Sequence, residues 1–111
     1  MRTAQEVFDH HWDAIMAGDM DRLLSDYADD ALFVRPGQVA QGHAEITAFF
    51  EDIGGALDGF AVEQVSVTTA EPIVVLEWQG GHADGRSASG TDTFIIEDDK
   101  IRHQTLVFSV S

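Results

Sequence analysis

Apolar residues in the first half of the chain recur three and four positions apart, which predicts amphipathic helices there. Thr3 and Glu6 can form a capping box at the start of the first helix, and Gly18 can end it. Asp19 can cap a second, shorter helix that carries Tyr27 on its apolar face, so the two would pair as a helical hairpin. The two longer helices are expected over residues 3–17 and 43–57, with the shorter one between them.

The second half of the chain alternates apolar and polar residues, which predicts long β-strands. Val62 is out of phase with Val65 and Val67, which indicates a β-bulge. Asp84-Gly85 and Asp98-Asp99 are turn signals, so the long strands should follow one another as an antiparallel meander. The strands are expected over residues 31–34, 60–69, 73–82, 86–97 and 100–110.

Helices followed by strands are typical of an α+β protein with one antiparallel sheet. Three apolar helix stripes need a sheet face to cover, and long strands that contain a bulge tend to curl. We therefore expect residues 1–111 to form a single domain, in which a curved antiparallel β-sheet wraps around three N-terminal helices. This is a cone-shaped α+β barrel of the cystatin-like type. The mouth of such a cone is a common small-molecule site.

The chain of 111 residues carries 20 acidic and 6 basic side chains, for a net charge of −14 with neutral histidines. Such a charge repels phosphate groups, which argues against nucleic acids and anionic membrane surfaces as partners. The hydrophobic fraction is 44%, enough for a packed core, so disorder is not expected. The acidic clusters Asp26-Asp29-Asp30 and Glu97-Asp98-Asp99 are expected to be solvated turns.

The sequence contains no cysteine, which excludes disulfides, zinc ribbons, iron–sulfur clusters and thiol catalysis within it. Its five histidines have no metal-binding spacing, so no metal site is predicted. No glycine-rich phosphate loop occurs, and we expect no cofactor. No apolar run could span a bilayer, and the first residues do not resemble a secretory signal. These features predict a soluble, cytoplasmic protein.

Three segments carry a further signal: DYADDALFVRPG, QGHAEITAFFEDI and the ending DTFIIEDDKIRHQTLVF. They resemble the nuclear transport factor 2-like superfamily, and most closely its SnoaL-like and ketosteroid-isomerase-like branches. The resemblance covers nearly the whole chain and implies the cone-shaped fold, with a homodimer through the outer face of the sheet. It implies less about activity, because this fold serves many functions.

Asp92 is the first candidate for chemistry, because it lies in mid-strand on the same face as Phe94 and Ile96. A carboxyl group between apolar neighbours loses hydration, so its pKa should rise and it could act as an acid or a base. By resemblance, this position looks like the oxyanion-stabilising Asp of ketosteroid isomerase and the acid–base Asp of SnoaL-like cyclases. Pairing with an Arg, or exposure to solvent, is the alternative.

His11 falls on the apolar stripe of the first helix with Val7 and Ile15, so it should face inward. By resemblance it stands where ketosteroid isomerase has its catalytic Tyr, and it could donate a hydrogen bond to a ligand oxygen or shuttle a proton. A core histidine bonded to a backbone carbonyl is the alternative. The neighbouring His10 is expected to face solvent.

Arg35 precedes Pro36, where, by resemblance, ketosteroid isomerase has its proton-abstracting Asp. A guanidinium cannot abstract a proton at neutral pH, so steroid isomerisation by that mechanism is not expected. Arg35 could instead clamp a ligand oxygen, form a salt bridge with Asp92, or lie on the surface. Gly90 stands where the limonene-epoxide-hydrolase branch needs an Arg, which argues against that activity.

Three functions remain open on this evidence. The first is a cofactor-free acid–base enzyme, such as an isomerase, cyclase or dehydratase, that acts on a small apolar carbonyl-type ligand through Asp92, His11 and Arg35. The second is ligand binding without turnover. The third is a dimeric scaffold whose cavity is filled by its own aromatic side chains. The residues expected to line the cavity are Trp12, Tyr27, Phe33, Phe50, Trp78, Phe94 and Phe108.

Overall fold

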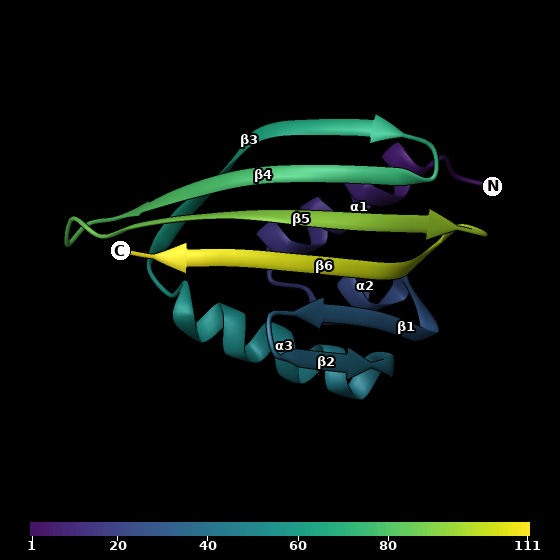
Figure 1. Ribbon diagram of the computed structural model, residues 1–111, viewed down its shortest axis with the longest axis horizontal. Helices are drawn as coiled ribbons and strands as arrows, with labels where there is room; N and C mark the ends of the chain where they lie inside the picture. The colour runs from purple at the N-terminus through teal and green to yellow at the C-terminus, as the bar shows by residue number, and fades with distance from the viewer.

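The computed structural model describes residues 1–111 and contains three helices and six strands (Figure 1). The strands form one curved sheet, and α1 and α2 lie behind it in Figure 1, with α3 behind the β1–β2 edge. This arrangement confirms the expected α+β class. The helices are α1 (Ala4–Ala17), α2 (Met20–Ser25) and α3 (Gly42–Ala56), and the strands are β1 (Tyr27–Arg35), β2 (Gln38–Gln41), β3 (Phe60–Ala70), β4 (Ile73–His82), β5 (Ser87–Glu97) and β6 (Lys100–Val110).

Local capping signals set the boundary between the first two helices, as the sequence predicts. The Thr3 hydroxyl accepts a hydrogen bond from the Glu6 N–H at 3.1 Å, and the Glu6 carboxylate accepts one from the Thr3 N–H at 2.9 Å. Gly18 ends α1 with a φ of +66°, a left-handed conformation that residues with a side chain rarely adopt. Asp19 caps α2 by accepting from the N–H of Arg22. The turn between α1 and α2 is therefore fixed by its own residues.

The strands of the sheet run in the order β2-β1-β6-β5-β4-β3. Strands β3 to β6 form the expected antiparallel meander. β1 differs, because it pairs in parallel with β6, so the sheet is mixed rather than purely antiparallel. Both strands start at the same end of the sheet, where the Ile101 N–H donates to the Asp26 carbonyl at 2.7 Å. β2 and β3 are free edges, so the sheet curves without closing into a barrel.

β1 begins earlier than expected, and a strand that was not predicted follows it. Tyr27 opens β1, although helical spacing predicts it on a face of the second helix. Pairing with Ile101 of β6 overrides that local preference. β2 escaped prediction because it is short and buries only Ala40. It pairs with β1 across a turn in which Gly37 has a φ of +76°.

Alternation along the long strands decides which side chains face the helices. A bulge interrupts β3 between residues 64 and 66, close to the position that the phase of its valines indicates. β6 is apolar on both faces, so its sequence leaves the orientation open; Gln104 and Leu106 are buried, whereas Thr105 and Val107 are exposed. In β5 the predicted inward set of Asp92, Phe94 and Ile96 is buried, and in β4 the buried side chains are Val74, Leu76 and Trp78.

Candidate functional site

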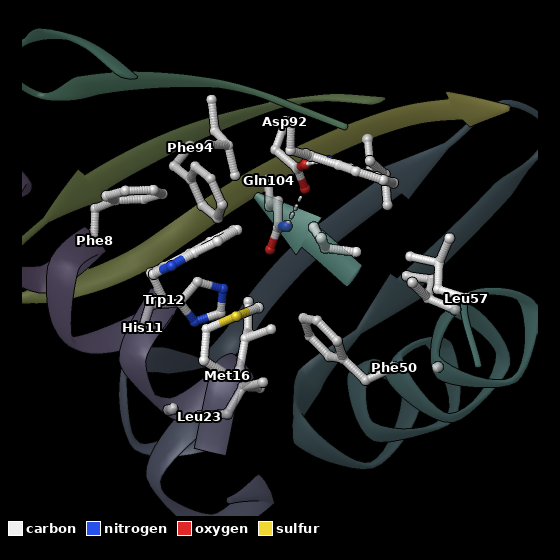
Figure 2. A pocket seen from close by; sticks show the side chains of 18 of the residues that line it. Phe8, His11, Trp12, Met16, Leu23, Phe50, Leu57, Asp92, Phe94 and Gln104 are labelled. Atoms are coloured by element: carbon white, nitrogen blue, oxygen red, sulfur yellow. Dashed lines mark hydrogen bonds between the residues drawn. The ribbon is translucent and has the colours of Figure 1, made fainter. Parts of the chain in front are cut away.

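A cavity of about 340 Å³ lies between the helices and the inner face of the sheet (Figure 2). All three helices and every strand except β2 contribute to its wall, which is mainly apolar. The ionisable and amide side chains in the wall are His11, Asp19, Asp92 and Gln104, and no Lys or Arg is among them. Its aromatic side chains are Phe8, Trp12, Phe33, Phe50, Trp78 and Phe94.

Asp92 lies in the middle of β5 and points from the sheet into the cavity. Leu76 of β4 and Leu106 of β6 flank it across the sheet, and only 6% of its surface is exposed. One carboxylate oxygen accepts a hydrogen bond from the Trp78 indole N–H at 2.9 Å, and the other accepts one from the Gln104 amide at 2.8 Å (Figure 2). Burial raises the pKa of Asp92 to about 6, against the opposing effect of these two donors.

Room for the Trp78 indole comes from Gly90, which lies directly opposite Trp78 on β5. A methyl group at position 90 would lie 2.6 Å from Cε2 of Trp78 and 2.8 Å from Cβ of Phe108, well inside normal contact distance. Without that methyl group the indole can lie over β5 and reach Asp92, two residues along the strand. A glycine in the interior of a strand is a sequence signal for such a close approach.

Gln104 connects Asp92 to two further polar groups in the interior. The Tyr27 hydroxyl donates to the Gln104 amide oxygen, and Nε2 of His11 lies 3.4 Å from the same hydroxyl. Burial raises the pKa of Tyr27 well above its ordinary value and lowers the pKa of His11 to about 4, so both are neutral near pH 7. Nδ1 of His11 is buried without a hydrogen-bond partner. We call these five residues, Trp78, Asp92, Gln104, Tyr27 and His11, the polar chain.

Arg35 does not reach the cavity, and the salt bridge with Asp92 that the sequence left open is not formed. Its Nη1 lies 3.0 Å from Oδ2 of Asp52, and its guanidinium lies 5.3 Å and 5.5 Å from the ring centres of Phe49 and Phe108. Arg35 is the last residue of β1, and its side chain packs against α3 and the end of β6 rather than against β5. The cavity is therefore left without a cation.

Most of the aromatic side chains expected in the cavity wall are there, with two exceptions. Tyr27 is fully buried beyond Gln104, and Phe108 packs against Trp78 with ring centres 5.9 Å apart. Gln104 was missed as a functional residue, although a lone amide on the buried face of a strand beside Leu106 is itself a signal. The expected residues that do line the cavity are Trp12, Phe33, Phe50, Trp78 and Phe94.

Asp26 corrects the prediction that the acidic clusters are solvated turns. Its side chain is fully buried, with Nη1 of Arg2 3.0 Å from one oxygen and Nδ1 of His10 2.7 Å from the other. His10 is consequently partly buried, contrary to the prediction that it faces solvent. The cause is tertiary, because the packing of α1 against the α2–β1 junction brings these two side chains to the carboxylate. Asp29 and Asp30 are exposed, as expected.

Other kinds of site are not evident. No three His, Asp or Glu side chains converge where a metal ion could sit. None of the three helices combines the length and the apolar character that a membrane span requires. The cavity, whose wall contains every member of the polar chain except Tyr27, is therefore the candidate functional site.

Comparisons with known proteins agree with this architecture. The family model described as a SnoaL-like domain matches residues 8–104, which include the whole polar chain. No curated protein matches the sequence.

Several solved structures share the fold. An NTF-2-like protein of unknown function from Burkholderia xenovorans is 25% identical and has a TM-score of 0.81, with 96% of this chain and 82% of that chain covered. A candidate polyketide cyclase from Sinorhizobium meliloti is 20% identical, with a TM-score of 0.79 and coverage of 92% and 94%. A protein named TerC, co-crystallised with polyporic acid, is 18% identical, with a TM-score of 0.78 and coverage of 96% and 91%. At the last two identities, the likeness concerns the fold alone.

Proposed function

This chain belongs to the SnoaL-like domain family, as the resemblance predicted, and from that premise we propose that it binds a small, largely apolar molecule in its cavity. Asp92 is the group that we expect to exchange a proton with that molecule. One observation carries the proposal: Asp92 is a buried carboxylate, with no cation beside it, in the wall of an otherwise mainly apolar cavity. Perturbed acids of this kind are typical of catalytic sites.

The cavity wall favours a neutral ligand with one polar end. No Lys or Arg lines the cavity, and the whole chain carries a net charge of −14. A ligand carboxylate or phosphate would therefore meet no counter-charge there. Two of the neighbours, TerC co-crystallised with polyporic acid and the candidate polyketide cyclase from Sinorhizobium meliloti, support a small organic ligand.

The chemistry that we propose is proton transfer without a cofactor, as in an isomerase, cyclase or dehydratase. With a pKa of about 6, Asp92 is mostly ionised at neutral pH and can take a proton from an acidic carbon or hydroxyl. The hydrogen bonds from Trp78 and Gln104 hold the carboxylate in place. Once protonated, the same group can return the proton to another atom of the ligand.

One observation favours a second function, binding without turnover. An enolate or alkoxide intermediate needs hydrogen-bond donors at its oxygen. Three groups suited to that task are engaged elsewhere, because Arg35 contacts Asp52, Trp78 donates to Asp92, and the Tyr27 hydroxyl donates to Gln104. A scaffold whose aromatic side chains fill its own cavity has no comparable support, since about 340 Å³ remains open.

Asp92→Asn separates the two functions. Ligands are first found by thermal shift among neutral ketones, enols, phenols and polyketide fragments, and each hit is then assayed for turnover. If Asp92 is the base, the variant loses about 10²–10⁴-fold in turnover, while its ligand affinity changes by no more than about tenfold.

The matched control is Glu97→Gln, which neutralises an exposed carboxylate of the same strand and should change neither quantity. Full turnover in Asp92→Asn would remove the acid–base assignment. Saturable binding without any turnover in the unchanged protein would support the second function. A chemically broad library without a single hit would contradict ligand binding altogether.

We also propose a homodimer through the outer face of the sheet, which the family resemblance implies. Its support is that Val65 and Val107 line one shallow hollow of that face with 58% and 61% of their surfaces exposed. Val107→Lys should convert a dimer into a monomer in sedimentation velocity, whereas a monomeric unchanged protein would contradict the proposal. A cytoplasmic location stays a prediction, to be checked by cell fractionation.

A further inference from the structure

The polar chain has a direction, because each of its hydrogen bonds fixes the next. Two N–H donors, from Trp78 and Gln104, aim at the two oxygens of Asp92, which is the arrangement that an ionised carboxylate requires. Gln104 therefore turns its amide nitrogen toward Asp92. Its amide oxygen then faces the opposite way, toward Tyr27.

The hydrogen-bond roles of Tyr27 and His11, at the far end of the polar chain, follow from that orientation of Gln104. An amide oxygen can only accept, so the Tyr27 hydroxyl gives its single proton to Gln104. The Tyr27 oxygen is left as an acceptor for the group beside it, which is Nε2 of His11. A neutral imidazole that carries its proton on Nε2 has a lone pair on Nδ1. That lone pair is buried and has no partner.

The wall of the cavity, which includes Asp92 and His11, therefore offers acceptors in two places. Asp92 carries lone pairs beyond the two that Trp78 and Gln104 use, and Nδ1 of His11 carries one that nothing uses. A hydroxyl group suits this site, because it donates to the carboxylate and can accept the second N–H of Gln104. A carbonyl or ether oxygen could accept the same Gln104 N–H, but it has no proton to give to Asp92 or to Nδ1 of His11, so both acceptors would stay without a donor.

We propose that the polar chain makes this cavity select ligands that carry a neutral hydroxyl group, such as a phenol or an enol, over the matching ketone or ether. This inference rests on the proposed ligand-binding function and names its ligand class. Tyr27, which does not line the cavity, and Gln104 act as positioning residues, because together they set the proton of His11 on Nε2. His11 is thus an acceptor, whereas the family resemblance places it where a donor stands.

The first experiment compares three probes that share a naphthalene ring and differ in one substituent: 2-naphthol, 2-methoxynaphthalene and 2-acetylnaphthalene. Their affinities for the unchanged protein are measured by calorimetry at neutral pH, where the naphthol is uncharged. A hydrogen bond to a charged group should make the naphthol bind about tenfold or more tightly than its methyl ether. The ketone should bind no better than the ether.

The second experiment reads the direction of the polar chain without any ligand. ¹⁵N NMR of the histidine ring nitrogens distinguishes the two neutral tautomers, and comparison with His11→Gln assigns the signal. We expect the His11 proton on Nε2. In Gln104→Met the Tyr27 hydroxyl loses its acceptor and should turn to Nε2, which moves the imidazole proton to Nδ1. Gln79→Met, which removes an exposed amide bonded to Glu63, is the matched control and should leave the tautomer unchanged.

The outcomes separate this inference from the proposed function. Equal affinities for the three probes, or tighter binding of the ketone, would overturn the inference and leave small-molecule binding intact. If none of the probes binds, the ligand class of the proposed function is contradicted. The tautomer of His11 then decides by itself the direction of the polar chain. A His11 proton on Nδ1 in the unchanged protein would overturn the inference whatever the probes do, because the hydrogen bonds of the polar chain would then point in the opposite direction.

Discussion

The chain buries two carboxylates whose surroundings are opposite. Asp26, at the junction of α2 and β1, lies between Arg2 at 3.0 Å and His10 at 2.7 Å. Asp92, in the middle of β5, is held only by neutral N–H donors from β4 and β6. Asp26 is fully buried and Asp92 nearly so, which means that burial by itself does not distinguish them.

The difference in partners separates structural from chemical roles. Arg2 binds Asp26 and also Asp99 in the β5–β6 turn. These contacts hold the N-terminus against two distant segments of the chain. Asp26 does not line the cavity. Asp92 faces the cavity with no cation beside it, and its pKa of about 6 lets it gain or lose a proton near neutral pH. A cationic partner therefore distinguishes Asp26 as a structural carboxylate, and the lack of one distinguishes Asp92, for which we propose a chemical role.

The largest effect should come from Asp26→Asn, which removes the charge that Arg2 and His10 share. Breaking a buried ion pair typically costs about 3–5 kcal/mol. We expect a loss of about 3 kcal/mol in the free energy of unfolding, because both partners are partly exposed and can be solvated. Urea denaturation measures the loss, with the exposed Asp29→Asn as control. A loss below about 1 kcal/mol is what a solvated surface pair would give, and it would contradict a structural role for Asp26.

Asp92→Asn should have the opposite sign near neutral pH. The pKa of Asp92 is about 6 in the folded protein and 3.8 ordinarily, so raising the pH through this window ionises the buried group and destabilises the fold. The penalty is absent below the lower value and complete above the higher one. Two pKa units correspond to about 3 kcal/mol. The stability of the variant minus that of the unchanged protein should therefore rise by up to about 3 kcal/mol between about pH 4 and pH 8.

Because His11 also titrates, the quantity to measure is the difference in the free energy of unfolding between the unchanged protein and Asp92→Asn. Its pKa of about 4 lies below the ordinary 6.5, so it removes stability as the pH falls through that window, opposite in sign to Asp92. This contribution is common to both proteins and cancels in the difference. Trp78 and Gln104, the groups bonded to Asp92, do not titrate in this range. Parallel curves of stability against pH for the two proteins would contradict a raised pKa of Asp92.

Gly90→Ala should cost about 1–3 kcal/mol, as overpacking of a core does. The added methyl group would lie 2.6 Å from Cε2 of Trp78, so the indole must move and its N–H must leave Asp92. Loss of that donor should raise the pKa of Asp92 further, which an NMR titration of the carboxyl group would follow. At Gly81 an added methyl group meets nothing, so Gly81→Ala is the control. An unchanged pKa would show that the indole does not tune Asp92.

The smallest effect is expected for Arg35→Met. The pair with Asp52 is largely open to solvent on the Asp52 side, and such pairs contribute less than about 1 kcal/mol. Because Arg35 does not line the cavity, affinity for any ligand found by thermal shift should stay within about twofold of the unchanged protein. A tenfold loss of affinity would show that Arg35 takes part in ligand binding, and it would contradict the statement that the cavity lacks a cation.

Features that depend on neighbouring residues could be predicted from the sequence. β4 and β6 begin and end where alternation places them, and Thr3 and Glu6 form the predicted capping box. The inward positions of Asp92 and His11 also follow from periodicity, because the repeats of a strand and of a helix are local properties. The resemblance in three segments identified the family, which the match over residues 8–104 confirms.

Only the tertiary structure decided which side chains meet. Alternation fixes the face of a strand on which Gln104 lies, but its partners Asp92 and Tyr27 are 12 and 77 residues away in the sequence. Tyr27 reaches Gln104 only because β1 pairs in parallel with β6, a long-range register that no local pattern contains. The burial of Asp26 could not be predicted for the same reason, because its partners Arg2 and His10 are also distant in the sequence. The sequence by itself therefore determined the fold and the inward carboxylate, and the packing of distant strands decided what that carboxylate is bonded to.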